Sequence, residues 1–244
     1  MNDRSSLARR DLLATLPVPM SQAGVHLLRL RQRIKLRMWE HSIGSVLAVK
    51  RLIDIVLSGA ALLFGLPFLA LVALLVYLDD PGPVFYTQTR VGKDGRLFPF
   101  YKFRSMRVGA DKMKDQLMQQ NESKDGVIFK MKNDPRITRV GKTLRRFSID
   151  EAPQILNVFL GDLSIVGPRP PIPREVAQYT LEERKRLHIK PGLTCFWQIQ
   201  GRSDIPFKDQ VRLDLLYIAS QSVWMDLWII IKTIPAVLLG KGAY

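Results

Sequence analysis

An apolar run dominates the hydropathy pattern of the chain. Between Leu52 and Leu78 the only charged side chain is Asp54, and the run exceeds the roughly 20 residues that cross the hydrocarbon core of a bilayer. Residues 1–51 precede it and no small-residue cleavage site closes it, so we do not expect a cleaved signal peptide. The pattern therefore predicts a membrane helix.

The flanks of this run and a proline within it bear on its topology. Basic residues precede the run and follow it: Arg29, Arg31, Arg33, Lys35, Arg37, Lys50 and Arg51, then Arg90, Lys93, Arg96, Lys102, Arg104 and Arg107. A spanning helix carries its basic excess on one side, whereas both flanks here have the composition of cytoplasmic segments. Pro67 removes a backbone hydrogen bond near the middle and favours a bend. These features predict a re-entrant hairpin that enters and leaves by one face. An ordinary spanning helix that tolerates its proline is the alternative.

The segments on either side of the run have weaker patterns. Residues 25–40 are basic and rich in leucine, which predicts a helix resting on anionic lipid, or else a solvated arm. Residues 84–91 and 96–103 have the pattern of two strands joined as a hairpin through Gly92–Gly95. The polar residues 109–126 predict a surface helix or a mobile loop.

Two further helices are expected toward the C-terminus. Residues 149–160 carry apolar side chains at roughly helical spacing, and Gly161 follows as a stop signal. Residues 223–239 are apolar but include Asp226, Lys232 and Pro235, which predicts an interfacial helix rather than a second span.

Together these elements predict an α+β fold, mostly α, in three parts. A basic N-terminal arm, interfacial or disordered, occupies residues 1–49. A re-entrant membrane helix broken at Pro67 occupies residues 50–80. A compact cytoplasmic catalytic domain, with a small β-hairpin and interfacial amphipathic helices, occupies residues 81–244.

Composition narrows the chemistry of this domain. The 244 residues carry a formal net charge of +15, which favours anionic partners. The histidines, His26, His41 and His188, lie far apart, and Cys195 is the single cysteine, so no spacing suggests zinc. A lone cysteine fits a reducing compartment, and we expect Cys195 to be a buried structural thiol rather than a nucleophile.

An acidic pair stands out in this basic chain. Asp150 and Glu151 are adjacent in RRFSIDEAPQ, and three residues separate them from the basic pair of that segment. One interpretation is structural: Ser148 and Glu151 have the spacing of a capping box, or Asp150 is itself the cap, with Pro153 in the first turn. The other interpretation is functional, because carboxylates that suit Mg²⁺ and arginines that bind phosphate are together the parts of a phosphoryl-transfer site.

Other candidates lie downstream of the pair. The stiff backbone of GPRPP would present Arg169 at a fixed angle, although a proline-rich turn with a solvated arginine explains it as well. Trp197, Gln198 and Arg202 could stack on and hydrogen-bond a nucleotide, although a lone tryptophan is more often a core residue.

Six segments, in order, resemble the bacterial sugar transferases, which are monotopic phosphoglycosyl transferases, or polyprenyl-phosphate hexose-1-phosphate transferases. They are KRLIDIVLS, the proline-containing apolar run, DDPGPVFYTQTRVGKDGRLFPFYKFRSM, DPRITRVGKTLRRFSIDEAPQILNVFLGDLSIVGPRPP, KPGLTCFWQIQGRSD and GKGAY. The resemblance covers about residues 50–244. Any one of these motifs is weak, whereas six in order are highly specific.

The resemblance implies an enzyme of the bacterial inner membrane, monotopic on its cytoplasmic face. It would transfer a sugar 1-phosphate from a nucleotide (usually uridine) diphosphate sugar to a polyprenyl phosphate such as undecaprenyl phosphate. Nucleoside monophosphate would leave, and the product would start exopolysaccharide, capsule or other surface-glycan synthesis. Asp150 would be the nucleophile that forms an aspartyl-phosphosugar intermediate, and Glu151 a Mg²⁺ ligand. The substrate phosphates or the lipid head group would meet Lys102, Arg145 and Arg169, with Gln198 and Arg202 nearby.

Two positions depart from the family pattern. Relatives commonly have Ser-Pro where this chain has Leu66–Pro67, and many have glycine where it has Cys195.

Two other functions remain open. A membrane-anchored Mg²⁺-dependent phosphohydrolase would use the same carboxylates with water as acceptor. A membrane-bound nucleic-acid-binding module would use only the positive charge. The family interpretation, which we favour, involves no nucleic acid, and the pattern predicts neither the sugar nor an oligomeric state.

Overall fold

The computed structural model describes residues 22–110, 112–113, 131 and 134–239, with the backbone alone for residues 22–43 and 203. It divides into two compact units, Met1–Ala48 and Val49–Tyr244, and the second holds every element discussed below except the first part of α2. Most of residues 109–126, the expected surface helix or loop, lies outside the described residues.

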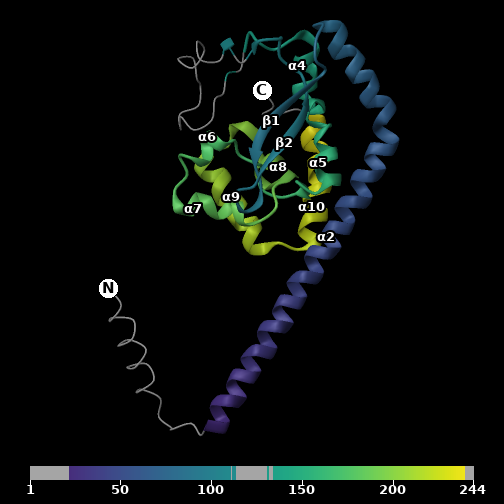
Figure 1. The fold of residues 1–244 in the computed structure, drawn as a ribbon. Coiled ribbons are helices and arrows are strands. Elements are labelled where there is room, and N and C mark those ends of the chain that lie inside the picture. The colour runs from purple at the N-terminus through teal and green to yellow at the C-terminus, as the bar shows by residue number, and fades with distance from the viewer. Residues whose placement is uncertain (1–21, 111, 114–130, 132–133, 240–244) are drawn as a thin grey trace. The chain divides into compact units, whose positions relative to one another are not determined.

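Helix α2, Gln22–Asp79, contains both the basic segment and the apolar run (Figure 1). The helical prediction for residues 25–40 is therefore confirmed. The helix continues without a break from this basic segment into the apolar run. The backbone also stays helical through Pro67. A proline removes one hydrogen bond of the ladder, so a helix can continue past it with a bend. The part of α2 after Val49 is bowed in Figure 1, and the hairpin stays a prediction.

Residues Gly44–Asp79 form the one helix in the described part of the chain that is long and apolar enough to cross a membrane. Its two ends contact the same folded unit. Near the start, Asp54 Oδ1 accepts hydrogen bonds from Ser164 Oγ at 3.1 Å and from the Ile165 amide at 2.9 Å. Near the end, Val72 and Val76 pack in one apolar cluster with residues of β2 and α4. Between these contacts much of the helix is exposed, and Phe64 is 79% exposed.

Strands β1, Phe85–Val91, and β2, Leu97–Phe103, form the predicted antiparallel hairpin. A short turn of 3-10 helix, η1, Lys93–Gly95, joins them, and Gly95 adopts a left-handed φ of 83° that suits glycine. Phe98 and Phe100 of β2 are buried against Val158 and Leu163, so one face of the hairpin forms part of the core.

The predicted helix at residues 149–160 is present in two pieces. Helix α4, Arg139–Arg146, precedes it, and then come η3, Ile149–Glu151, and α5, Gln154–Leu160. The stop signal at Gly161 is confirmed, because this residue ends α5 with a left-handed φ of 99°.

A second sheet of two short parallel strands follows, β3, Ser164–Val166, and β4, Gly192–Thr194. The backbones approach closely where β3 ends: a Cβ on Gly192 would stand 2.0 Å from the Gly167 nitrogen. Only glycine fits there, and the contact fixes the start of the loop that carries Arg169.

The remaining described elements are short helices and two longer ones: α6 Pro173–Val176, α7 Leu181–Arg184, η4 Lys185–His188, α8 Phe196–Gln200, η5 Arg202–Asp204, α9 Phe207–Ser220 and α10 Val223–Leu239. Helix α10 buries Asp226 and Ile229 but exposes Trp224 by 81% and Ile231 by 65%, as an interfacial helix would. The fold is mostly helical with two small sheets, consistent with the predicted α+β class.

A buried polar cluster joins α2 to α10 and β3. Lys50 Nζ donates to Asp226 Oδ2 at 2.5 Å, to the Val166 carbonyl at 2.8 Å and to Tyr217 Oη at 3.1 Å. Tyr217 Oη in turn lies 2.6 Å from Asp226 Oδ1. Each buried polar group in this cluster therefore has a partner. The cluster holds the end of β3, three residues before Arg169.

Candidate active site

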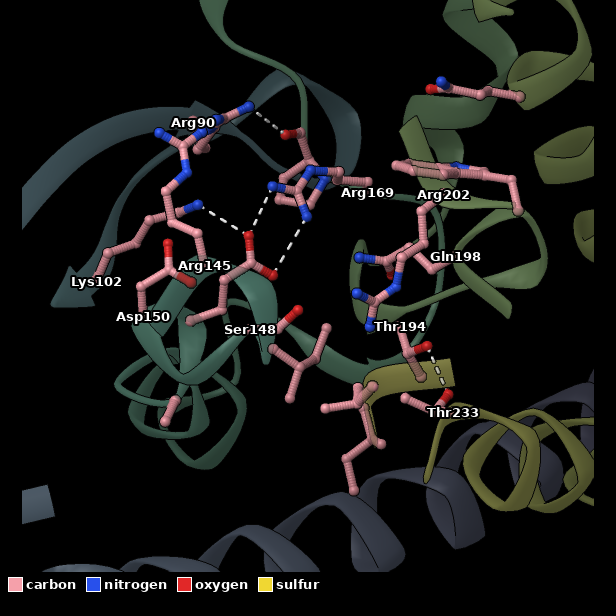
Figure 2. A pocket seen from close by; sticks show the side chains of 18 of the residues that line it. Arg90, Lys102, Arg145, Ser148, Asp150, Arg169, Thr194, Gln198, Arg202 and Thr233 are labelled. Carbon is pink, nitrogen blue, oxygen red and sulfur yellow. Dashed lines mark hydrogen bonds and ion pairs between the residues drawn. The ribbon is translucent and has the colours of Figure 1, made fainter. Parts of the chain in front are cut away.

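A pocket of about 750 Å³ brings together the seven residues expected to act in catalysis or phosphate binding. Lys102, Asp150 and Arg145 lie on one side in Figure 2, with Gln198 and Arg202 on the opposite side and Arg169 between them. Among the described residues that line it, cations outnumber carboxylates: Arg90, Lys102, Arg145, Arg169, Arg186 and Arg202 against Asp150, Glu151 and Glu175. The excess of positive charge suits an anionic ligand.

The acidic pair is presented by a strained turn. Ser148 has a left-handed φ of 55°, which is uncommon for a residue with a side chain and is frequent at functional sites. The turn continues into the 3-10 helix η3, which carries Asp150 and Glu151 into the pocket. The two carboxylates therefore share a site but have different surroundings.

Glu151 is held between two cations. Its Oε1 accepts hydrogen bonds from Lys102 Nζ at 2.8 Å and from Arg169 Nη2 at 2.7 Å, and its Oε2 accepts from Arg169 Nη1 at 3.3 Å. Burial alone would raise the pKa of Glu151, but Arg169 and Lys102 hold it well below its ordinary range. Glu151 is therefore an ionised carboxylate.

Asp150 is buried, with 7% of its surface exposed, and Figure 2 draws no hydrogen bond or ion pair to its carboxylate from the other residues shown. Burial raises the pKa of Asp150, although the nearby charges of Lys102 and Arg145 oppose the rise. A buried carboxylate in a pocket, with a pKa raised by desolvation and with cations nearby, is a candidate for a functional role.

Both capping interpretations of this pair are wrong. Ser148 makes no capping hydrogen bond, and the N-cap of α5 is Pro153 rather than Asp150. The Glu151 side chain does not turn back to the Ser148 amide, because Lys102 and Arg169 bind it instead. Partners distant in the sequence have overridden the local pattern.

Arg169 lies on the loop after β3, and Arg90 contacts the same loop. Arg169 binds Glu151, so it is not the solvated arginine of a bare turn. Arg90, on β1, was not among the expected site residues. Its Nη1 donates to the Pro170 carbonyl at 2.9 Å, and burial together with Arg169 lowers its pKa to about 10. The sequence offered little reason to place Arg90 in a site, because an arginine in a strand with alternating polar and apolar residues usually faces solvent.

The opposite wall comes from α8 and η5. Trp197 is buried, with 6% exposed, as its core interpretation anticipated, yet it also lines the pocket. Arg202 adopts a left-handed φ of 53°, and its Nη1 is buried without a partner in the described residues. Cys195 is a free buried thiol whose pKa is raised by burial, which fits the expected structural role.

The carboxylate pair is too small a ligand set for a metal bound by protein side chains alone, but it suits Mg²⁺, which also binds water and substrate phosphates. In the described residues no group of three or more His, Cys, Asp or Glu side chains could hold a metal ion. Mg²⁺ usually takes one or two carboxylates, with water and substrate phosphates completing its shell. Asp150 and Glu151 supply that number of oxygen ligands beside a pocket that suits an anion.

Comparison with known proteins identifies relatives along most of the chain. The galactosyl transferase CpsE of Streptococcus agalactiae is 46% identical over 203 residues, which are 82% of this chain and 44% of that protein. The exopolysaccharide production protein ExoY of Rhizobium meliloti is 39% identical, over 80% of this chain and 88% of that protein. The undecaprenyl-phosphate galactose phosphotransferase of Salmonella typhimurium is 40% identical, over 80% and 42%.

The chain thus spans less than half the length of CpsE and of the Salmonella enzyme, but most of the length of ExoY. Residues 45–240 match the family described as bacterial sugar transferase. This match includes the apolar part of α2 after Gly44, the acidic pair and every described residue that lines the pocket. The chain therefore belongs to the bacterial sugar transferase family.

Proposed function

We propose that this protein transfers a sugar 1-phosphate from a uridine diphosphate sugar to undecaprenyl phosphate and so initiates a surface polysaccharide. The observation that carries the proposal is Asp150, a buried carboxylate in a pocket with an excess of cations. The name of the Salmonella relative, an undecaprenyl-phosphate galactose phosphotransferase, supports the acceptor.

The proposed reaction has two displacements at one phosphorus atom. An Asp150 carboxylate oxygen attacks the phosphorus that bears the sugar, the bond from that phosphorus to the bridging oxygen breaks, and uridine monophosphate leaves. A phosphate oxygen of the lipid then attacks the same phosphorus, and the Asp150 carboxylate leaves. The product is a polyprenyl diphosphate sugar. A covalent intermediate of this kind divides one difficult step into two easier ones.

The cations of the pocket have distinct parts in this scheme. Lys102 and Arg169 already flank Glu151 and stand beside the attacked phosphate, where they neutralise charge that spreads over its oxygens. Arg145 and Arg202 reach the pocket from opposite sides, so they can hold the leaving and entering phosphates. Glu151, with Asp150 adjacent, would hold Mg²⁺, which supplies further positive charge to the diphosphate.

The proposed location is the cytoplasmic face of the inner membrane, with α2 re-entrant. Both ends of its apolar part contact the same folded unit, at Asp54 and at Val76, while Phe64 between them is exposed. A straight span would have to place those two contacts, about 33 Å apart along a helix, on opposite membrane faces. A helix whose middle enters the bilayer and whose ends stay at one interface satisfies both contacts.

The release of uridine monophosphate tests this function. Donor alone should give a single burst no larger than the enzyme concentration, and steady turnover should require undecaprenyl phosphate. Steady release into water without lipid would instead indicate a phosphohydrolase. The absence of any burst, with product formed only when both substrates are present, would exclude the covalent intermediate.

Asp150→Asn is the matched variant for the same assay. It should lower the burst rate at least about a thousandfold, because an amide cannot replace the nucleophilic carboxylate. Its free energy of unfolding should equal or exceed that of the wild type, since desolvation no longer disfavours a charged group at this position. Near-normal activity would return Asp150 to a structural role.

A further inference from the structure

The pocket has a second, apolar part that the proposed nucleotide sugar does not explain. Helix α10 lines it with Ile230, Thr233, Ile234, Val237 and Leu238. These positions follow the spacing i, i+3, i+4, i+7 and i+8, which is one face of a helix. A nucleotide diphosphate sugar carries no aliphatic hydrocarbon chain, so the donor has no part that matches this wall.

Two threonines at this wall present little polarity to the pocket. The hydroxyls of Thr194 and Thr233 lie 2.8 Å apart, and Thr233 also donates to the Ile229 carbonyl at 2.8 Å (Figure 2). Because each hydroxyl has a partner in the protein, neither needs a ligand to satisfy it. The wall therefore continues from α10 to β4 without an unmet hydrogen-bonding group at either threonine.

The apolar part opens to the surface on the exposed side of α10. Ile234 is 59% exposed and Leu238 is 68% exposed, although both line the pocket. Neighbouring residues that do not line it, such as Trp228 at 44% and Ile231 at 65%, extend the apolar surface. One pocket thus joins the cations around Asp150 to an apolar surface that suits a membrane interface.

We propose that this apolar part, bounded by Ile155, Leu193, Thr194 and one face of α10, receives the first isoprene units of the polyprenyl phosphate. The inference rests on the proposed function and assigns the acceptor's place within it. The acceptor is the one substrate that combines a phosphate with a hydrocarbon chain, and the pocket has both surfaces in that order. The chain would leave the pocket past Ile234 and Leu238 and enter the bilayer directly.

The arrangement also separates the two substrates. The donor lies on the polar side, between the Asp150 wall and the Arg202 wall, and its departure as uridine monophosphate leaves the apolar wall unchanged. The acceptor phosphate can then approach the phosphorus on Asp150 from the side of α10.

Ile234→Gln, with Ile231→Gln as the matched control, tests this inference. Both residues are exposed isoleucines in α10, but only Ile234 lines the pocket. The KM for undecaprenyl phosphate is measured at saturating donor, and the burst of uridine monophosphate is measured without lipid. We expect Ile234→Gln to raise the lipid KM about tenfold, equivalent to about 1.4 kcal/mol, with an unchanged burst. Ile231→Gln should change this KM less than about twofold.

A second acceptor separates the groove from general membrane binding. A water-soluble ten-carbon prenyl phosphate carries the first isoprene units but no long membrane chain. Ile234→Gln should raise its KM as well, because these units are the ones placed in the groove. An effect on the long acceptor alone, or equal effects of the two variants, would overturn the inference.

Leu238→Gln repeats the test one turn along the helix. Loss of the burst in both groove variants would also overturn it, because the groove would then belong to the donor. Absence of lipid-dependent turnover in the wild type would instead refute the proposed function.

Discussion

Removal of Lys50 should both destabilise the fold and disturb the site. Lys50 and Asp226 form an ion pair whose side chains are 10% and 11% exposed, so solvent can do little to replace a lost partner. In Lys50→Met, Asp226 Oδ2 loses its donor. Tyr217 Oη has one proton for two acceptors, Asp226 at 2.6 Å and the Val166 carbonyl at 3.2 Å. Two buried acceptors therefore lose their donor within the cluster: Asp226 Oδ2, and whichever of the two that the Tyr217 hydroxyl does not serve.

The expected cost follows from this loss. Breaking a buried pair by removing one partner costs about 3–5 kcal/mol, a large share of the roughly 5–15 kcal/mol that stabilises a typical domain. The free energy of unfolding is measured by denaturant titration of the protein in lipid nanodiscs. The double variant Lys50→Met/Asp226→Leu should be more stable than Lys50→Met alone, because it removes the uncompensated charge as well.

The same variant should affect the donor more than the acceptor. Val166 ends β3, and Arg169 follows three residues later in the loop that the Lys50 cluster holds. A less ordered loop weakens the contact of Arg169 with phosphate, so the donor KM should rise in any folded fraction. A destabilisation below about 1 kcal/mol, or additive effects in the double variant, would refute the buried-cluster argument.

Three further predictions concern the turn, the pH dependence and the topology. Ser148→Ala should change the free energy of unfolding by less than about 0.5 kcal/mol, against about 1 kcal/mol for the loss of a true cap, while Ser148→Gly should stabilise the turn. The proposed nucleophile, Asp150, acts only when deprotonated, and burial raises its pKa. The burst rate should therefore fall with decreasing pH with a midpoint above the ordinary pKa of an aspartate, and a lower midpoint would contradict this. In a Cys195→Ser background, Leu47→Cys should react with an impermeant reagent only from the cytoplasmic side. When Pro67→Leu is added, a fraction of the molecules should react at position 47 from outside the membrane. Outside labelling with Pro67 intact would show a true span.

Local signals in the sequence predicted the elements whose causes are local. The β1–β2 hairpin follows from alternation on both sides of a glycine-containing turn, and the end of α5 follows from Gly161. The parallel pair β3–β4 was not predicted, because three residues per strand are too few for a periodic signal. The capping box failed for the opposite reason. Its pattern was clear, but Glu151 found stronger partners 49 and 18 residues away.

The sequence predicted which residues line the candidate site better than it predicted how they are arranged. Charged residues in family motifs identified Lys102, Asp150, Glu151 and Arg169, and the fold gathers them in one pocket. Arg90 was missed, since nothing local separates a buried strand arginine from a solvated one. The pairing of Lys50 with Asp226, across 176 residues, depends on how α2 and α10 pack, which no local pattern carries.

The clamp on Glu151 has a consequence for which anions the site admits. Lys102 and Arg169 are two of the cations that the proposed diphosphate would contact, and Glu151 already binds both. At these two cations an incoming anion must therefore replace a carboxylate rather than fill a free site. In the proposed function, a diphosphate that arrives with a metal for Glu151 would replace it more readily than a singly charged anion. The glutamate thus acts as an internal competitor that sets a threshold for entry, and the site gains selectivity from a contact that weakens its affinity for every anion.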